Sequence, residues 1–157
     1  MIIPEQIYRL VESKLKDRWM LVVRANQALF VAQAQAVRIT ASAFDAIPVH
    51  GGAKDSPAEK AALRVIQAED KLHVAEKWQD AFAMTDKAFP WESTAEGVLA
   101  GYLYGNGMNL ADAARAAGCS RKTAMRLRDN YVGHCALFAA SMGLITFGRD
   151  KDADANG

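Results

Sequence analysis

Basic side chains gather in one short stretch of a chain that is otherwise close to neutral. The 157 residues carry 19 Lys and Arg against 18 Asp and Glu, a formal net charge of +1. Between Leu110 and Asn130, however, five basic residues oppose only Asp112 and Asp129. The five are Arg115, Arg121, Lys122, Arg126 and Arg128. Guanidinium and ammonium groups grip phosphate oxygens, and the planar arginine fork also matches the O6 and N7 acceptors of guanine. The local excess therefore predicts a surface for double-stranded DNA.

Small residues in the same stretch, residues 110–129, follow the pattern of a helix-turn-helix. The positions that carry this pattern are Ala114, Gly118, Cys119, Ser120, Ala124 and Leu127. The first alanine lets two helices cross closely, and the glycine lets the chain leave the first helix with a positive φ. The cysteine fills the turn, the serine caps the second helix, and the last two residues face the core. An ordinary helical hairpin with a solvated basic face would explain the glycine, but it would not require all six positions together.

The side chains left on the outer face of the second helix are the predicted DNA contacts. They are Ser120, Arg121, Lys122, Met125 and Arg126. The second helix of such a motif enters the major groove with its N-terminal residues. The two arginines and the lysine are therefore expected to reach base edges, and Arg115 and Arg128 to bind phosphates. Met125 would contact a thymine methyl group or would pack within the protein.

Residue types that could support catalysis or bind metal do not form a familiar arrangement. The histidines and cysteines are His50, His73, His134, Cys119 and Cys135. Their spacing matches no common zinc site, and both cysteines fit better as thiols than as a disulfide. The sequence has no glycine-rich phosphate loop after a strand and no recognisable Ser/His/Asp arrangement. We therefore expect a protein that is not an enzyme and that needs no metal or cofactor.

The elements that must position the motif are predicted to be helices throughout, which makes an all-α fold. Apolar residues recur at three- and four-residue steps from Pro4 to about Ala43. One unbroken helix of that length would span ~60 Å, so a kink or a partner chain packed alongside is expected. We expect this first helix to mediate self-association as a dimer. Pro and Gly residues then form a linker, and Ser56 as N-cap with Glu59 opens a central helix that ends before Pro90.

A third helix leads into the motif, and the recognition helix extends beyond it. Ser93 as N-cap with Glu96 predicts the start of the third helix, and Gly105-Asn106-Gly107 predicts its end. The apolar stripe of the recognition helix continues through Ala124, Leu127, Tyr131, Cys135, Phe138, Met142 and Ile145. The division expected is a helical arm over 1–47, a linker over 48–57, a helical domain over 58–148 and a disordered tail over 149–157.

Hydropathy gives no reason to expect a membrane protein. The first residues lack the pattern of a signal peptide, and no apolar run approaches the roughly 18–20 residues that a membrane span needs. The expectation is a cytoplasmic protein.

On these residues, the region from about Ile47 to Ile145 resembles phage and prophage late-gene transcriptional regulators of the ArpU/RinA type. That group is similar to the sigma-factor domain that binds the −35 promoter element. The resemblance lies in the Pro/Gly-rich linker, in the helix that begins Ser56-Pro57-Ala58-Glu59, and in Tyr102–Gly107 directly before the motif. The sequence departs from the group in having alanine at positions where larger aliphatic residues are usual, such as Ala113 and Ala117. The resemblance implies an activator of packaging or lysis genes, with RNA polymerase as a further partner.

A different class of DNA-binding protein remains open. Small terminase subunits, the adaptors of phage DNA packaging, also join a helix-turn-helix to long oligomerising helices. They usually place the DNA-binding element first, and the order here is the reverse, which favours the regulator. A purely helical interaction protein would leave the basic face without a role.

Overall fold

The structure, a computed structural model, describes residues 3–45 and 56–148. These residues form helices and no strand, so the predicted all-α fold is confirmed. The helices are α1 (Glu5–Lys16), α2 (Leu21–Asp45), α3 (Pro57–Ala88), α4 (Ala95–Ala100), the π-helical turn η1 (Gly101–Gly105), α5 (Leu110–Ala117) and α6 (Arg121–Ser141). Nowhere in these two ranges is a helix both long and apolar enough to cross a membrane.

The long N-terminal helix expected from the sequence is two helices, separated by a turn over residues 17–20. The N–H of Asp17 bonds to the carbonyl of Ser13 at 3.2 Å, and the N–H of Arg18 bonds to that of Leu15 at 3.2 Å. Val11 and Leu15, on α1, are fully buried. The expected kink is therefore a full interruption of the helix: α1 ends at Lys16 and α2 begins at Leu21.

The helices belong to two compact units whose boundaries differ from the expected domain division. One unit comprises the chain up to Arg18 and from Lys77 onward, and the other runs from Trp19 to Glu76. The expected arm over 1–47 is thus divided: α1 packs against α6 and η1 in the first unit, and α2 belongs to the second. Most of the predicted 48–57 linker and all of the predicted 149–157 tail lie outside the described residues. Ser56 does cap α3 as predicted, since its Oγ accepts the N–H of Glu59 at 3.1 Å.

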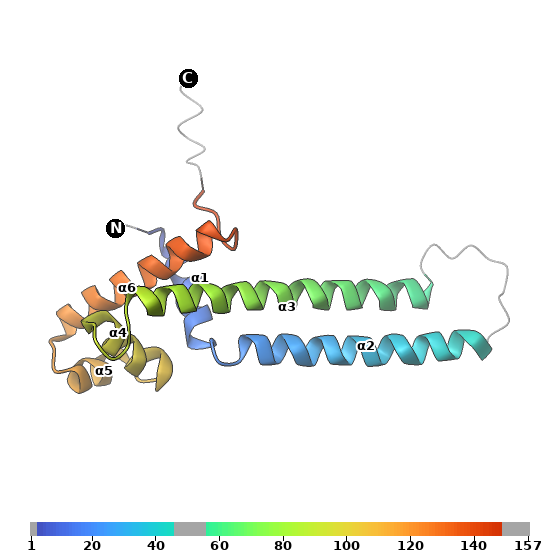
Figure 1. Ribbon diagram of the computed structural model, residues 1–157, viewed down its shortest axis with the longest axis horizontal. Helices are drawn as coiled ribbons and strands as arrows, with labels where there is room; N and C mark the ends of the chain where they lie inside the picture. Colours follow the sequence, from blue (N-terminus) through green and yellow to red (C-terminus); the bar gives the residue numbers. More distant parts are fainter. Residues whose placement is uncertain (1–2, 46–55, 149–157) are drawn as a thin grey trace, which may run out of the picture. The chain divides into compact units, whose positions relative to one another are not determined.

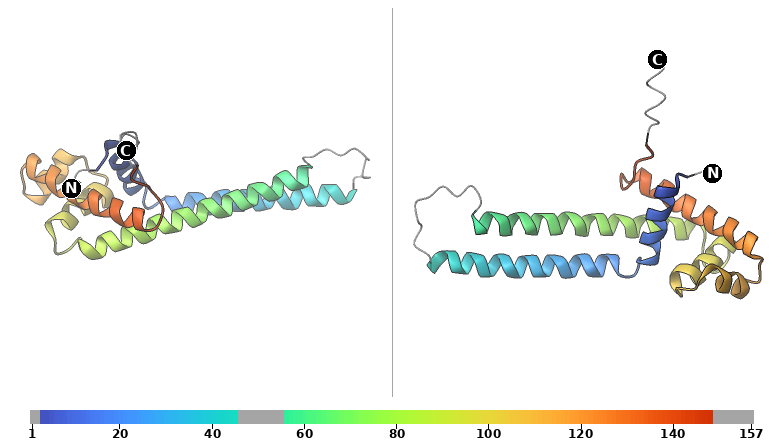
Figure 2. Two further views of the ribbon diagram at one scale, coloured as in Figure 1. Left: turned by 90° about the horizontal axis from the view of Figure 1, so that it is seen from above. Right: turned by 180° about the vertical axis from the view of Figure 1, so that it is seen from behind.

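The first unit, which we call the motif unit, is built around α6 (Figures 1 and 2). Large side chains fill its core, and Tyr131, Phe82, Leu15 and Leu99 are among those that are fully buried. The predicted stripe is confirmed on α6 at Ala124, Leu127, Tyr131 and Cys135, all of which are buried. The helix ends at Ser141, earlier than expected, so Ile145 is buried but lies beyond α6. Burial raises the pKa of the Cys135 thiol to about 12, so the thiol stays protonated at neutral pH.

The third helix begins one residue later than predicted. Thr94, not Ser93, is the N-cap, and its side chain accepts the N–H of Gly97 at 3.0 Å. A turn closes on the carbonyl of Pro90, which accepts the N–H groups of Ser93 at 3.2 Å and Thr94 at 3.1 Å. After this turn, Thr94 has an extended backbone and directly precedes the first helical residue, Ala95. The predicted capping box therefore does not form.

The end of the third helix agrees with the prediction, although the last turn is wider than an α-helix. The N–H of Asn106 bonds to the carbonyl of Gly101 at 3.0 Å, and Gly107 has a φ of 68°. A side chain at Gly105 would come within 2.9 Å of the Trp91 ring. The glycines of η1 thus leave space for the indole ring of Trp91 in the segment that precedes α5.

The second unit, which we call the hairpin unit, consists of α2 and the N-terminal part of α3, running antiparallel (Figures 1 and 2). On each helix the shielded positions follow one another at three- and four-residue steps. They are Val22, Ala25, Leu29, Ala32, Ala36 and Ile39 on α2, and Ala61, Val65, Ala68, Leu72 and Ala75 on α3. Such spacing is typical of two helices that pack along one seam.

Candidate nucleic-acid interface

The turn between α5 and α6 has the geometry that the sequence predicts. Gly118 adopts φ 71° and ψ 32°, the left-handed conformation. Its N–H bonds to the carbonyl of Arg115 at 3.2 Å, and the N–H of Cys119 bonds to that of Ala114 at 3.0 Å. These two bonds form the Schellman motif that closes a helix at a glycine. No atom lies within 4 Å of the place where a Cβ on Gly118 would stand, so the backbone conformation, not lack of space, favours glycine.

Side-chain caps fix the starts of both motif helices. The Oγ of Ser120 accepts the N–H of Thr123 at 3.1 Å, which confirms Ser120 as the N-cap of α6. The Ser120 hydroxyl also donates to Oγ1 of Thr123 at 3.0 Å. At α5, the side chain of Asn109 accepts the N–H of Asp112 at 2.8 Å. This second cap was not predicted, although an Asn three residues before an Asp at a helix start is a recognisable signal.

The inward positions of the motif are also as predicted. Ala114 is buried on α5, and Ala124 and Leu127 are buried on α6. Ala113 is also fully buried. At this position the late-gene regulators that the sequence resembles usually have a larger residue. Small side chains at these positions allow α5 and α6 to approach closely, as the helix pair of this motif requires.

Three basic side chains lie together on the outer face of α6. Arg121, Lys122 and Arg126 are all exposed, and Met125, also exposed, lies among them. At 100° per residue the four span an arc of about 140°, on the side opposite Ala124 and Leu127. Among the described residues, no carboxylate forms an ion pair with any of these three cations. Because their charge is not offset locally, this surface is suited to phosphate and to the acceptor-rich edge of guanine.

Arg115 extends the basic surface onto α5. Its side chain is 79% exposed and forms an ion pair with Asp112 at 2.8 Å. Asp112 is itself more than half exposed. Such solvent-exposed pairs contribute at most about 1 kcal/mol, so a phosphate group could displace the carboxylate. Arg115 is therefore placed as predicted for a contact to the DNA backbone.

Arg128 lies in different surroundings from the other predicted contacts. Its side chain is only 22% exposed, its guanidinium stacks 5.6 Å from the centre of the Tyr8 ring, and its Nε donates to Asp129 at 3.3 Å. The Tyr8 hydroxyl donates to the same carboxylate at 2.9 Å. Burial opposes the charge of Arg128, but Tyr8 and Asp129 outweigh it and raise the pKa of the guanidinium. The geometry therefore assigns Arg128 to the contact between α6 and α1 and does not bring it to the surface formed by Arg121, Lys122 and Arg126.

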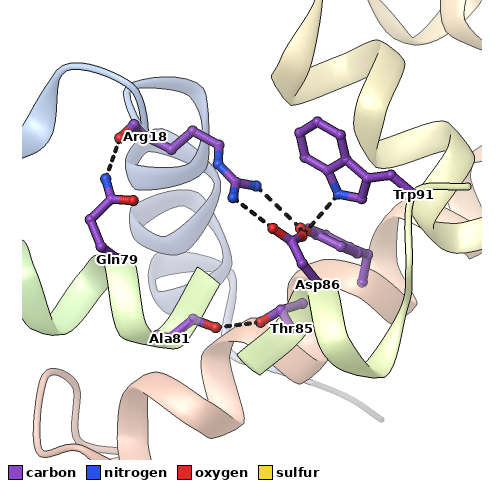
Figure 3. A network of polar contacts seen from close by, with 7 residues as sticks. Arg18, Gln79, Ala81, Thr85, Asp86 and Trp91 are labelled. Atoms are coloured by element: carbon purple, nitrogen blue, oxygen red, sulfur yellow. Dashed lines mark hydrogen bonds and ion pairs between the residues drawn. The ribbon is translucent and has the colours of Figure 1, made fainter. Parts of the chain in front are cut away.

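A buried polar network holds α6 in place behind this surface (Figure 3). Arg18 donates to Oδ2 of Asp86 at 2.7 Å, and the Tyr131 hydroxyl donates to Oδ1 of Asp86 at 2.5 Å. The indole N–H of Trp91 donates to the same Oδ1 at 2.9 Å. The amide of Gln79 donates to the backbone carbonyl of Arg18. One carboxylate on α3 thus joins the end of α1, the loop before α4 and the middle of α6.

The charges of this network are stabilised by one another. Burial opposes the charge of Arg18, yet the bond to Asp86 and its negative charge prevail and raise the pKa of the guanidinium. Burial and the bond to Asp86 raise the pKa of Tyr131, so its hydroxyl remains a donor. The guanidinium also lies 5.2 Å from the centre of the Phe82 ring and 5.0 Å from that of Trp91. This network could not be predicted from the sequence, because a lone Arg beyond an amphipathic helix is normally solvated.

Comparison of the chain with protein-family models, with curated proteins and with solved structures found no match. Within residues 3–45 and 56–148, no group of three or more His, Cys, Asp or Glu side chains could hold a metal ion. The candidate site therefore rests on the geometry of α5, α6 and their basic face.

Proposed function

We propose that this protein binds double-stranded DNA in a sequence-specific manner through α5 and α6. One observation carries the proposal: Arg121, Lys122 and Arg126 are exposed on the outer face of the helix that follows the Gly118 turn, and they form no ion pair with any residue of 3–45 or 56–148. That face is the one a recognition helix presents to the major groove. In this proposal the three side chains contact base edges and Arg115 contacts the phosphate backbone from α5.

The role we propose is regulation of transcription. The support is the resemblance to late-gene regulators of phages, which carry a helix-turn-helix of this kind after a linker and a charged helix. Activation of packaging or lysis genes in the cytoplasm, with contact to RNA polymerase, follows from that resemblance. A genome-wide immunoprecipitation of bound DNA would test it, with sites upstream of such genes as the expected result.

Selection of binding sites from a random duplex pool tests DNA recognition directly. The intact protein is expected to enrich one sequence, with affinity that falls steeply as salt rises, because each Arg–phosphate contact releases counterions. Arg121→Ala and Arg126→Ala should each cost about 1–3 kcal/mol and relax preference at one base position. Arg9→Ala is the matched control, since Arg9 is an exposed arginine on α1, outside the motif.

Two outcomes would contradict the proposal. Absence of binding at low salt would remove DNA binding altogether. Unchanged base preference in both Arg121→Ala and Arg126→Ala would show that α6 is not the reading helix, even if the protein still binds DNA.

The second candidate function is that of a DNA-packaging adaptor, which the long helices of the hairpin unit also suit. Such adaptors form closed rings, whereas a regulator that binds two half-sites is a dimer. Light scattering of the intact protein would separate the two: a ring would favour the adaptor, and a dimer the regulator.

A further inference from the structure

Among its described residues, the hairpin unit buries only alanines and leaves many of its large apolar side chains exposed. Its buried residues are Ala32, Ala61, Ala68 and Ala75. Its exposed large apolar residues are Trp19, Met20, Val23, Phe30, Val31, Val37, Leu63, Ile66 and Val74. A pair of helices that leaves this much apolar surface in water gains little from its own seam, and a patch of this kind marks an interaction site.

Three of the exposed residues form one stripe along α2. Val23, Phe30 and Val37 follow one another at seven-residue steps, which is two helical turns, so they lie on the same face. Phe30 is 73% exposed and Val37 is 70% exposed. No charged residue occurs from Ala25 through Val37. A solvent-facing helix normally carries charges on its outer face, so the composition of α2 indicates a face that is covered.

We propose that this stripe is where two copies of the chain associate, with α2 of one copy antiparallel to α2 of the other. The stripe is symmetric about Phe30, with a valine seven residues before it and another seven residues after it. A two-fold axis at Phe30 therefore sets the two phenylalanines against each other and Val23 of each copy against the partner's Val37. Such self-complementarity is what an isologous two-fold interface requires.

A shallow apolar hollow lies beside the C-terminal end of the stripe, lined by Ala36, Val37, Thr40 and Ala41. Because the two-fold arrangement sets Val23 of each copy against the partner's Val37, it brings a valine side chain beside this hollow.

Helix α3 widens the surface on the same side. Phe30 follows the shielded Leu29, and the exposed Ile66 follows the shielded Val65. Each of the two exposed residues lies one position after a residue of the seam between the helices. Because the helices are antiparallel, both side chains therefore lie on the same side of the helix pair. A face two helices wide, ~20 Å, and about 30–37 Å long measures roughly 600–740 Å². Stable interfaces of standard size bury about 600–1,000 Å² of each partner, so the hairpin face lies at the lower end of that range.

Association through this face is independent of DNA binding, since none of its residues lies in α5 or α6. It narrows the self-association expected for Pro4–Ala43 to α2, because α1 packs against α6 and η1 within the motif unit. Two motif units joined in this way would bind paired half-sites with a gain from effective concentration.

Light scattering of the intact protein over a range of concentrations tests the proposal. The unaltered chain is expected at twice the mass of one chain, and Phe30→Glu at the mass of one. Val31→Glu is the matched control: it places the same charge one residue further along, about 100° around the helix, and should leave the dimer intact. Circular dichroism shows whether each variant keeps its helices.

Cross-linking supplies a result that does not depend on a disruptive change. Phe30→Cys in a Cys119→Ser background should give a covalent dimer with a short bismaleimide, and Val31→Cys in the same background should not. Cys135 is buried and does not compete.

Three results would overturn the proposal. These are a single-chain mass for the unaltered protein at every concentration, a ring larger than a dimer, or equal cross-linking at positions 30 and 31. A monomer that sediments with phospholipid vesicles, and loses this in Phe30→Glu, would assign the stripe to a membrane surface instead.

Discussion

The two units of this chain differ in the size of the side chains that their helices bury. In the motif unit, Phe82, Leu99 and Tyr131 are fully buried, and the partly exposed Asp86 carboxylate joins three segments. In the hairpin unit the buried side chains are alanines, while Phe30 lies 73% exposed. Fully burying a Leu or Phe side chain contributes about 1.5–3 kcal/mol, and an alanine far less. The motif unit can therefore be stable within one chain, whereas the hairpin unit gains most of its stability when its outer face is covered.

Truncation of one phenylalanine in each unit tests this difference most severely. Phe82→Ala leaves a cavity in the core of the motif unit and should cost about 3–5 kcal/mol, whatever the protein concentration. Phe30→Ala should cost little at low concentration, where the chain is monomeric, and more at high concentration, where the dimer forms. Thermal melting at two concentrations measures both. Equal, concentration-independent losses for the two variants would mean that the contrast between the units is wrong.

Removal of the Asp86 carboxylate should have an effect of about the same size. Asp86→Ala removes the ion pair that Asp86 forms with the buried Arg18 guanidinium, and loss of such a pair costs about 3–5 kcal/mol. Arg9→Ala is the control, because it breaks the Arg9–Glu5 pair, which lies on the surface and contributes at most about 1 kcal/mol. Denaturant unfolding gives both values. A loss below 1 kcal/mol for Asp86→Ala would show that the network does not hold α6 in place.

A smaller loss is expected at the turn of the motif. Gly118→Val should destabilise the motif unit by about 1–3 kcal/mol, since a β-branched residue is strained at a positive φ. Gly118→Asn should cost less, because Asn tolerates this conformation and the site has space for a side chain. Melting temperatures decide it, and equal losses for both variants would point to a steric cause instead of backbone strain.

The sequence predicted local features better than contacts between distant segments. Gly118, Ser120 and the alanine positions were predictable because a turn and a cap depend on neighbouring residues. The Arg18–Asp86 pair was not, since it joins residues 68 positions apart and neither residue type is usually buried. A kink between Pro4 and Ala43 was expected, but its place at residues 17–20 was not predicted, for the same reason. The periodicity of that region fits one helix, and only the docking of α1 onto α6 shows where it must end.

The two outer arginines of the motif allow a last, smaller test. Both were predicted to bind phosphates, but Arg115 is 79% exposed whereas Arg128 is stacked on Tyr8 and bonded to Asp129. Arg115→Ala should lower the slope of log affinity against log salt by about one unit, the loss of one phosphate contact. Arg128→Ala should leave that slope nearly unchanged and lower the melting temperature instead, because it removes a contact between α6 and α1. Binding titrations at several salt concentrations, with melting of each variant, measure both effects. If Arg128→Ala lowered the slope as much as Arg115→Ala, the Tyr8–Arg128 stack would have to open when DNA binds, and α1 would then take part in recognition.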